Sequence, residues 1–248
     1  MTRARLFVGA ALLAVALAGC GGGAKQTTTT TATSVTTAVK LYFLRNGKVK
    51  PIAREVWDRE PAHVVAFREL IKGFGVGEFI TLRSSVHVVD DGYTLARSRD
   101  GLITLATASP QPRTALAQIV YTLTPYSAGG VVVVDGTRYR RTDFEAQTPA
   151  ILVESPLPYQ TAPSPIRVTG TANTFEATFQ YELVDAAGTV IARHFVTATS
   201  GSGTRGTFDV TIPYPAGHAG PGKLVVYESS AKDGARINVA KIPFRLSG

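Results

Sequence analysis

Apolar and polar residues along the first folded stretch predict a β-hairpin followed by a helix. Asn46 and Gly47 separate the runs VKLYFLR and VKPIAREVW, and this dipeptide suits the positive φ angles of a two-residue hairpin turn. Residues 60–72 then show a helical pattern, and Gly73 follows as a stop signal. The apolar stripe of this helix consists of Val64, Phe67, Leu70 and Ile71.

A second helix and two further hairpins are predicted downstream. The stretch RTALAQIVYTL has the clearest helical pattern, because its apolar residues recur at i, i+3, i+4 and i+7. SSVHVVDDGYTLARS predicts a hairpin that turns at Asp91 and Gly92, and GGVVVVDGTRYRR one that turns at Asp135 and Gly136. Residues 39–147 are therefore predicted to form a small α+β sandwich, in which two helices pack on one face of a single sheet.

From residue 148 onward the pattern contains only strands, turns and prolines. Seven strand candidates follow at short spacing: AILVES, IRVTGTAN, FEATFQYELVD, VIARHFVTAT, GTFDVTIPY, GKLVVYESS and INVAKIPFRL. In the fifth, Phe208, Val210 and Ile212 alternate with polar residues. The pattern predicts a two-sheet β-sandwich over residues 148–248. Four prolines are expected to stiffen its entry and strand edge: Pro156, Pro158, Pro163 and Pro165.

The first twenty residues have the layout of a secretory signal peptide. Arg3 and Arg5 precede the apolar run LFVGAALLAVALA, which is shorter than the roughly 20 apolar residues of a transmembrane helix. The tetrapeptide LAGC resembles the lipobox of bacterial lipoproteins, in which the chain is cut between the last two residues, here Gly19 and Cys20, and the cysteine sulfur is acylated. The alternatives for this lone cysteine are a thiol in an ordinary signal peptide or a buried structural thiol.

Lipidation of Cys20 implies that the chain is held on the extracytoplasmic face of the cell membrane, since two or three acyl chains anchor a protein firmly. The residues that follow are mainly Gly and Thr and predict a flexible tether. We therefore expect a signal peptide over 1–19, a tether over 20–38 and domains over 39–147 and 148–248.

The charge of the chain favours anionic partners in the envelope. The formal net charge of +8 falls to +6 without residues 1–19, which contain two arginines and no acidic residue. Basic residues are scattered along the sequence, and an exported protein meets no chromosome. We therefore expect contact with an anionic membrane or wall polymer and no nucleic-acid partner.

Two parts of the chain resemble known domain families. VKLYFLRNGKVKPIAREV, AQIVYTLTPY and VVVVDGTRY are similar to the GerMN domain. ESPLPYQTAPSPIRVTGTANTFEATFQYELVDAAGTVI, FVTATSGSGTRGTFDVTIPY and YESSAKDGARINVAKIPFRL resemble the Gmad-type immunoglobulin-like domain of spore germination and sporulation proteins. Together the resemblances cover nearly all of residues 39–248. They imply an envelope lipoprotein of Gram-positive, actinobacterial type, whose domains serve assembly or ligand binding and carry no catalytic residue.

The sequence offers no catalytic or cofactor motif. His87 and His194 lie in strand patterns, His63 lies in the first turn of a helix, and His218 lies in a Gly/Pro loop, so no serine-type triad is indicated; a GxSxG element is also absent. No two histidines have the spacing of metal ligands, and GSGTRG at 201–206 favours a strand connection over a phosphate loop.

Several aspartates also have a structural interpretation. Asp90, Asp91 and Asp135 are predicted to support chain reversals, and Asp233 with Gly234 to form another turn. A calcium ion held by the sandwich loops is the alternative for these carboxylates.

Aromatic and charged residues of the second domain offer two interpretations. Phe175, Phe179 and Tyr181 are expected mostly on one strand face and therefore in the core, with a polar network around them; the alternative is a binding surface at one end of the sandwich. The charged members of the set are Glu228, Arg205 and Arg236. Trp57 is likewise expected to be a packing anchor and not an exposed ligand platform.

The combined prediction is a non-enzymatic, membrane-anchored lipoprotein that acts as an interaction or assembly module in the cell envelope. Its expected partners are the membrane, through the lipid anchor, and an envelope protein. The first alternative is a binder of peptidoglycan or anionic wall polymer, and an envelope hydrolase is the least favoured function. No cofactor or metal is predicted.

Overall fold

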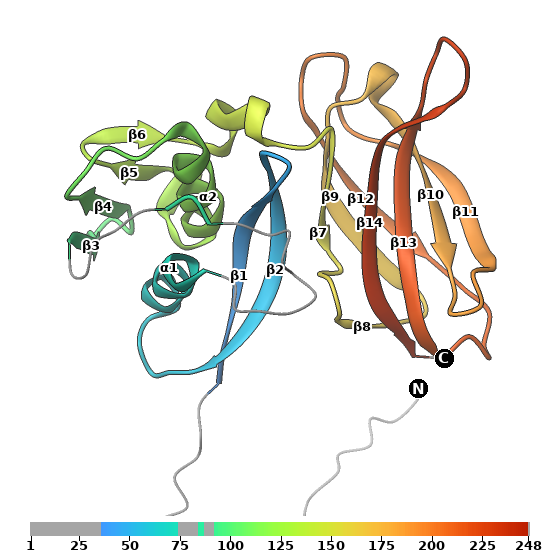
Figure 1. The fold of residues 1–248 in the computed structure, drawn as a ribbon, viewed down its shortest axis with the longest axis horizontal. Helices are drawn as coiled ribbons and strands as arrows, with labels where there is room; N and C mark the ends of the chain where they lie inside the picture. The colour runs from blue at the N-terminus through green and yellow to red at the C-terminus, as the bar shows by residue number, and fades with distance from the viewer. Residues whose placement is uncertain (1–35, 74–83, 87–91, 248) are drawn as a thin grey trace, which may run out of the picture. The chain divides into compact units, whose positions relative to one another are not determined.

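The computed structural model describes residues 36–73, 84–86 and 92–247, and its secondary structure is drawn in Figure 1. The described part of the chain begins with an antiparallel hairpin of β1 (Thr36–Arg45) and β2 (Lys48–Trp57). Asn46 and Gly47 form its turn with φ angles of 52° and 73°, which confirms the predicted hairpin.

Both predicted helices are present and pack on the hairpin. Helix α1 (Ala62–Lys72) ends at Gly73, whose backbone angles, φ 71° and ψ −165°, lie in a region that favours glycine. Helix α2 spans Arg113–Leu123, as its apolar spacing predicts. Both helices contact β1 and each other, so the hairpin has a buried face.

A four-stranded sheet completes this part. Its order is β3 (Tyr93–Arg97), β4 (Ile103–Thr107), β5 (Val132–Val134) and β6 (Thr137–Tyr139), with only β4 and β5 parallel. Asp135 and Gly136 turn β5 into β6, as predicted, with φ angles of 48° and 78°. The predicted turn at Asp91 falls outside the described residues.

The expectation of a single sheet in this part is wrong for the strands that the structure describes. Strands β1 and β2 pair only with each other, and β3 to β6 form a separate sheet. One hydrophobic core nevertheless joins them, because the helices contribute side chains that pack against both. Its largest fully buried members include Tyr42, Phe43, Phe67, Phe144 and Leu123.

Two short 3₁₀ segments connect α2 to β5, and a third connects β6 to the second part. They span Thr124–Tyr126 (η1), Ala128–Gly130 (η2) and Arg141–Gln147 (η3).

All seven strands predicted after residue 148 are present and form two sheets. One has the order β12 (Gly206–Ile212), β9 (Ile166–Ala172) and β7 (Ile151–Ser155). The other has the order β11 (Val190–Thr197), β10 (Thr178–Val184), β13 (Gly220–Ser229), β14 (Arg236–Ser247) and β8 (Thr161–Pro163). A 3₁₀ turn, η4 (Phe175–Ala177), precedes β10.

Strand alternation builds the core between these sheets. In β12, Phe208 and Ile212 are buried, while Thr207, Asp209 and Thr211 are exposed, as predicted. Phe208 and Phe179 meet edge to face with ring centroids 4.9 Å apart. The core is separate from the one around α1 and α2.

The short strand β8, which the sequence did not predict, lets the chain change sheets. Strand β7 pairs with β9, and after the proline-rich segment β8 pairs in parallel with the end of β14. Pro163 lies in β8, at the edge of the larger sheet, which agrees with the predicted role of the prolines.

Gly170 of β9 is expected to be intolerant of any side chain. A Cβ atom there would lie 2.1 Å from the Leu152 carbonyl oxygen and 2.6 Å from Phe208 Cζ. We predict that Gly170→Ala lowers the free energy of unfolding by about 3 kcal/mol through overpacking, as measured by chemical denaturation. Thr211→Ala, on an exposed position of β12, should change it by less than about 0.5 kcal/mol. Equal effects of the two substitutions would contradict this packing.

Candidate functional site

Several residues singled out from the sequence lie outside the described part of the chain. Gly19 and Cys20, the predicted cleavage and lipidation residues, are among them, as are His87, Asp90 and Asp91. Their predicted roles therefore stay predictions.

The aromatic and charged residues of the second part make three sets of contacts. Arg236 binds the Glu182 carboxylate at 2.6 and 3.0 Å and stacks 4.2 Å from the Tyr227 ring centroid. Glu228 accepts hydrogen bonds from the Phe175 amide and the Asn238 side chain, both at 2.8 Å. These carboxylates are buried, so their partners stabilise charge that would otherwise be costly to bury.

Arg205 forms the third group. It donates two hydrogen bonds of 2.8 Å to the Glu145 carboxylate and one of 2.9 Å to the Pro149 carbonyl oxygen. Glu145 lies in η3, before the first strand of the sandwich, so this bidentate pair joins the two parts of the chain. No local pattern indicated this partnership, because the two residues are 60 positions apart.

Two aromatic residues expected in the core are exposed. Phe175 is 61 % exposed, because it begins the η4 turn and so does not follow the alternation of β10. Trp57, the last residue of β2, is 71 % exposed and is not a packing anchor. Phe179 is buried as expected, and Tyr181 is half-buried.

The histidines that the structure describes do not lie together. His63 is in α1, His194 is exposed on β11 opposite Tyr181, and His218 Nδ1 lies 3.0 Å from Asp185 Oδ2 in a loop. Among the described residues, no three His, Cys, Asp or Glu side chains form a group that could hold a metal ion.

Two loop interpretations are confirmed. Asp135 accepts hydrogen bonds from the backbone and the hydroxyl of Thr107 at 2.6 and 2.7 Å, so its carboxylate supports the turn. Residues 201–206 connect β11 to β12; a Cβ atom at Gly201 or Gly206 would lie 2.4 or 2.3 Å from another backbone atom. The glycines of this loop therefore allow close chain packing.

A second network joins the two parts at Glu154 of β7. Its carboxylate accepts hydrogen bonds from Tyr42 Oη at 2.7 Å and Arg141 Nη1 at 2.8 Å, and Lys40 Nζ lies 3.4 Å away. Burial raises the pKa of the Tyr42 hydroxyl well above its usual value, so this group stays a proton donor.

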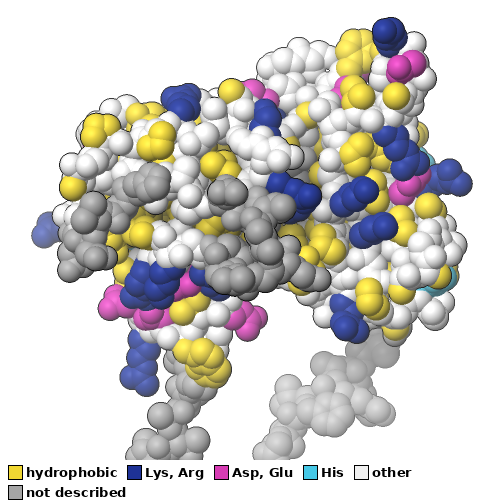
Figure 2. Space-filling model, in the orientation of Figure 1, with side chains coloured by type: hydrophobic (Ala, Val, Ile, Leu, Met, Phe, Trp, Pro, Cys, Tyr) yellow, Lys and Arg dark blue, Asp and Glu magenta, His cyan; other side chains and the backbone are white. Residues whose placement is uncertain are grey.

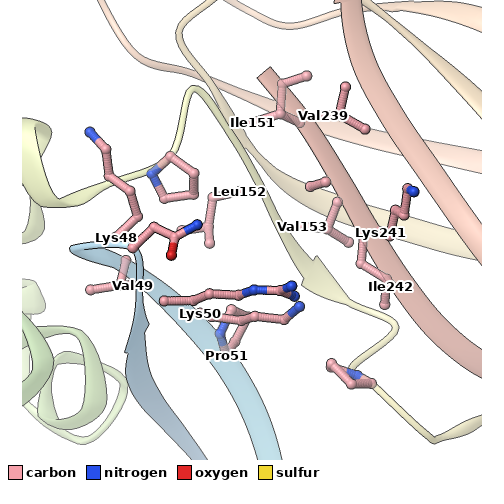
Figure 3. A pocket seen from close by; sticks show the side chains of 15 residues that line it. Lys48, Val49, Lys50, Pro51, Ile151, Leu152, Val153, Val239, Lys241 and Ile242 are labelled. Carbon is pink, nitrogen blue, oxygen red and sulfur yellow. The ribbon is translucent and has the colours of Figure 1, made fainter. Parts of the chain in front are cut away.

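Next to this network is a cleft with a volume of about 570 Å³, shown in Figure 3. It is lined by consecutive residues of three strands: the start of β2, the first half of β7 and the middle of β14. Its apolar walls include Val49, Pro51, Leu152, Val153 and Ile242.

The charged side chains around the cleft are all basic. Arg45, Lys48, Lys50 and Lys241 line it, and the lining includes no acidic residue. Lys48 Nζ donates to the Ala146 carbonyl oxygen at 2.8 Å. Burial, together with the nearby Arg45, lowers the pKa of Lys50. Figure 2 shows Lys and Arg side chains gathered over the central part of the face in view.

The sequence interpretation of scattered basic residues is wrong at this cleft. Three of the four basic residues come from RNGKVK at 45–50, and the fold adds Lys241 from the far end of the chain. The short spacing within RNGKVK was a usable signal for part of this site. Its combination with β14 could not be read from spacing.

A comparison with models of protein families found a match within the sandwich. Residues 150–235 match Gmad2, the immunoglobulin-like domain of bacterial spore germination. A search of curated proteins found no match to the chain. The match spans β7 to β13 and ends before β14, so residues 150–235 are similar to an immunoglobulin-like domain of the spore germination type.

The Glu154 network is expected to contribute to stability through its desolvated contacts. Glu154→Gln should lower the free energy of unfolding by about 1 to 3 kcal/mol, since a charged acceptor of three donors is lost. The control is Asp209→Asn, which removes the exposed pair with Arg167 and should cost less than about 0.5 kcal/mol. Denaturant titration of both variants measures the difference, and a larger loss for Asp209→Asn would contradict it.

Glu145 is expected to make stability depend on pH. Hydrogen bonds from Arg205 lower the pKa of its carboxyl below the usual 4.5, so the stabilisation is complete above 4.5 and is lost as pH falls through the lower native value. Glu145→Gln should therefore reduce the melting temperature at pH 7, and the difference from the wild type should vanish in acid. Glu60→Gln, at an exposed position before α1, serves as the control. A difference that grows in acid would contradict this assignment.

Proposed function

We propose that the protein is a lipoprotein anchored to the extracytoplasmic face of the cell membrane, where it acts as a non-enzymatic interaction or assembly module. The observation that carries the proposal is the LAGC tetrapeptide at the end of a charged and then apolar leader, with the only cysteine of the chain at Cys20. The match of residues 150–235 to an immunoglobulin-like domain of spore germination supports a role in the envelope.

The first folded part supports the same proposal through its resemblance to the GerMN domain. Its two helices and hairpin agree with the order of elements that the resemblance implies. We propose that residues 39–147 form a GerMN-like α+β domain and that both domains present surfaces for protein contacts. The proposal takes no germination role from the names of these domains.

The proposal assigns no reaction to the protein. In the described part of the chain, His63 lies in α1, His194 in β11 and His218 in a loop. An envelope hydrolase is therefore the least favoured function. No helix within the described residues has both the length and the apolar character needed to cross a membrane.

A binder of peptidoglycan or anionic wall polymer is the second candidate function. The basic cleft favours it, because four cations without a carboxylate attract an anionic ligand, most strongly at low salt. Co-sedimentation with purified cell wall tests this candidate, and failure to co-sediment at low salt would remove it.

The proposed lipid anchor is tested by measuring whether Cys20 is acylated and whether the protein stays with the membrane. We expect the wild-type protein to fractionate with membranes and to show, by intact mass, a mature chain that begins at an acylated Cys20. Cys20→Ala should lack the lipid and lose firm membrane attachment. Ser34→Ala, in the predicted tether, is a control that should leave fractionation unchanged.

Release of both proteins without lipid would contradict the proposal. A freely secreted ligand-binding protein would then be the better account. Crosslinking of the membrane-bound wild type tests the interaction role, which predicts specific envelope proteins among the products.

A further inference from the structure

The cleft exposes the backbone edge of β14. Ala240 and Ile242 turn their side chains toward the sandwich core, while Val239 and Lys241 point away from it and are exposed. All four consecutive residues nevertheless line the cleft. Because alternate side chains of a strand lie on opposite faces, a cavity that touches every residue in turn must meet the strand at its edge.

This edge has free hydrogen-bonding groups. Just before β8, the Tyr159 amide donates to the Pro243 carbonyl oxygen of β14 at 2.7 Å, and the Arg245 amide of β14 donates to the Gln160 carbonyl oxygen at 2.9 Å. In an antiparallel strand, every second residue directs both backbone groups to the same side. Lys241 therefore directs its N–H and C=O toward the cleft, and no described residue is seen to pair with them.

The other walls of the cleft are strand edges as well. Strand β7 pairs only with β9, and β2 pairs only with β1, among the described strands. Residues 151–153 and 48–51 line the cleft without a gap, as the residues of β14 do. The cleft is thus a slot between extended segments, a shape that suits another extended segment.

The chemistry of the slot indicates which segment it suits. Its cations are Arg45, Lys48, Lys50 and Lys241, so the complementary occupant is acidic. Its walls are apolar, and the neighbouring Val239 and Ile237 on β14 are 45 % and 42 % exposed. A peptide that alternates acidic and apolar side chains would satisfy the charge and the walls while its backbone pairs with β14.

We propose that this cleft binds an extended acidic segment of a partner protein, which adds as a strand to the open edge of β14. The inference rests on the proposed function and names the surface and the mode of contact for it. Main-chain hydrogen bonds supply affinity in such strand addition, and alternate side chains supply specificity.

Edge protection is the competing explanation of the same residues. Lysines and bulges on edge strands prevent unwanted pairing, and β14 has a bulge at Asn238 with a φ of 53°. Protection requires no apolar slot beside the edge, however. The lining of the slot includes the apolar residues Val49, Pro51 and Leu152, and this lining favours binding.

The test uses the full-length chain in detergent and a short fluorescent peptide of alternating glutamate and valine. Fluorescence anisotropy should show binding that weakens with salt. A peptide with the same side chains but with N-methyl groups on alternate amides should bind about tenfold more weakly, because it cannot pair with an edge. Poly(glycerol phosphate), a wall-type polyanion without amides, should compete poorly.

Two substitutions of Lys241 distinguish the contribution of its charge to peptide binding from that of its backbone N–H. Lys241→Ala removes the charge and should weaken binding about fivefold. Lys241→Pro also removes the edge N–H and should weaken it about fivefold further, since proline is tolerated where an edge N–H faces away from the sheet. Lys232→Ala, in the exposed loop between β13 and β14, is the control and should bind like the wild type. Melting curves check that each variant is folded.

Three results would overturn the inference: no binding of the acidic peptide, equal binding of the N-methylated peptide, or preferential binding of poly(glycerol phosphate). The first would support edge protection, and the last would support the wall polymer.

Crosslinking in membranes distinguishes this inference from the proposed function. If envelope proteins crosslink equally to wild type and to Lys241→Pro, the function stands and the cleft is not its surface. If the peptide binds but no envelope protein crosslinks to the wild type, the cleft stands and the proposed function fails.

Discussion

The burial of β7 on both faces is the constraint on which the rest of the structure depends. Leu152 belongs to the core built around α1 and α2, whereas its neighbours Ile151 and Val153 belong to the core of the sandwich. A strand shared by two cores cannot slip by one residue without moving every side chain into the wrong core. Glu154, the next residue, adds its contacts with Tyr42 and Arg141, so β7 joins the two parts by packing and by charge.

The cleft follows from this placement. Because β7 pairs with β9 in the smaller sheet and the chain reaches the larger sheet only at β8, the middle of β14 has no hydrogen-bonded strand on one side among the described strands. The β1–β2 hairpin brings its basic turn to the same place. The change of sheet at β8 thus leaves a free strand edge beside apolar residues and positive charge. The proposed interaction module could use these three features together.

Local sequence patterns predicted most helices, strands and turns. They did not predict which strands or charged residues that are distant in the sequence would pair. The turns at Asn46-Gly47 and Asp135-Gly136, both helices and seven sandwich strands follow from spacing and turn chemistry that act within a few residues. The separate sheet of β1 and β2, the short strand β8 and the Glu145–Arg205 pair depend on contacts between distant residues. Phe175 and Trp57 were misjudged because they lie where a strand begins or ends, and alternation does not extend there.

Hydrogen exchange of the β14 amides, followed by NMR, tests the open edge most directly. The account predicts that the Lys241 amide exchanges quickly in the free protein, while the Ile242 amide, directed at β13, exchanges slowly because it is paired. Adding the acidic peptide should slow the exchange of the Lys241 amide and leave that of the Ile242 amide unchanged. A Lys241 amide that is already as slow as that of Ile242 in the free protein would show that the edge is covered, and it would contradict the account.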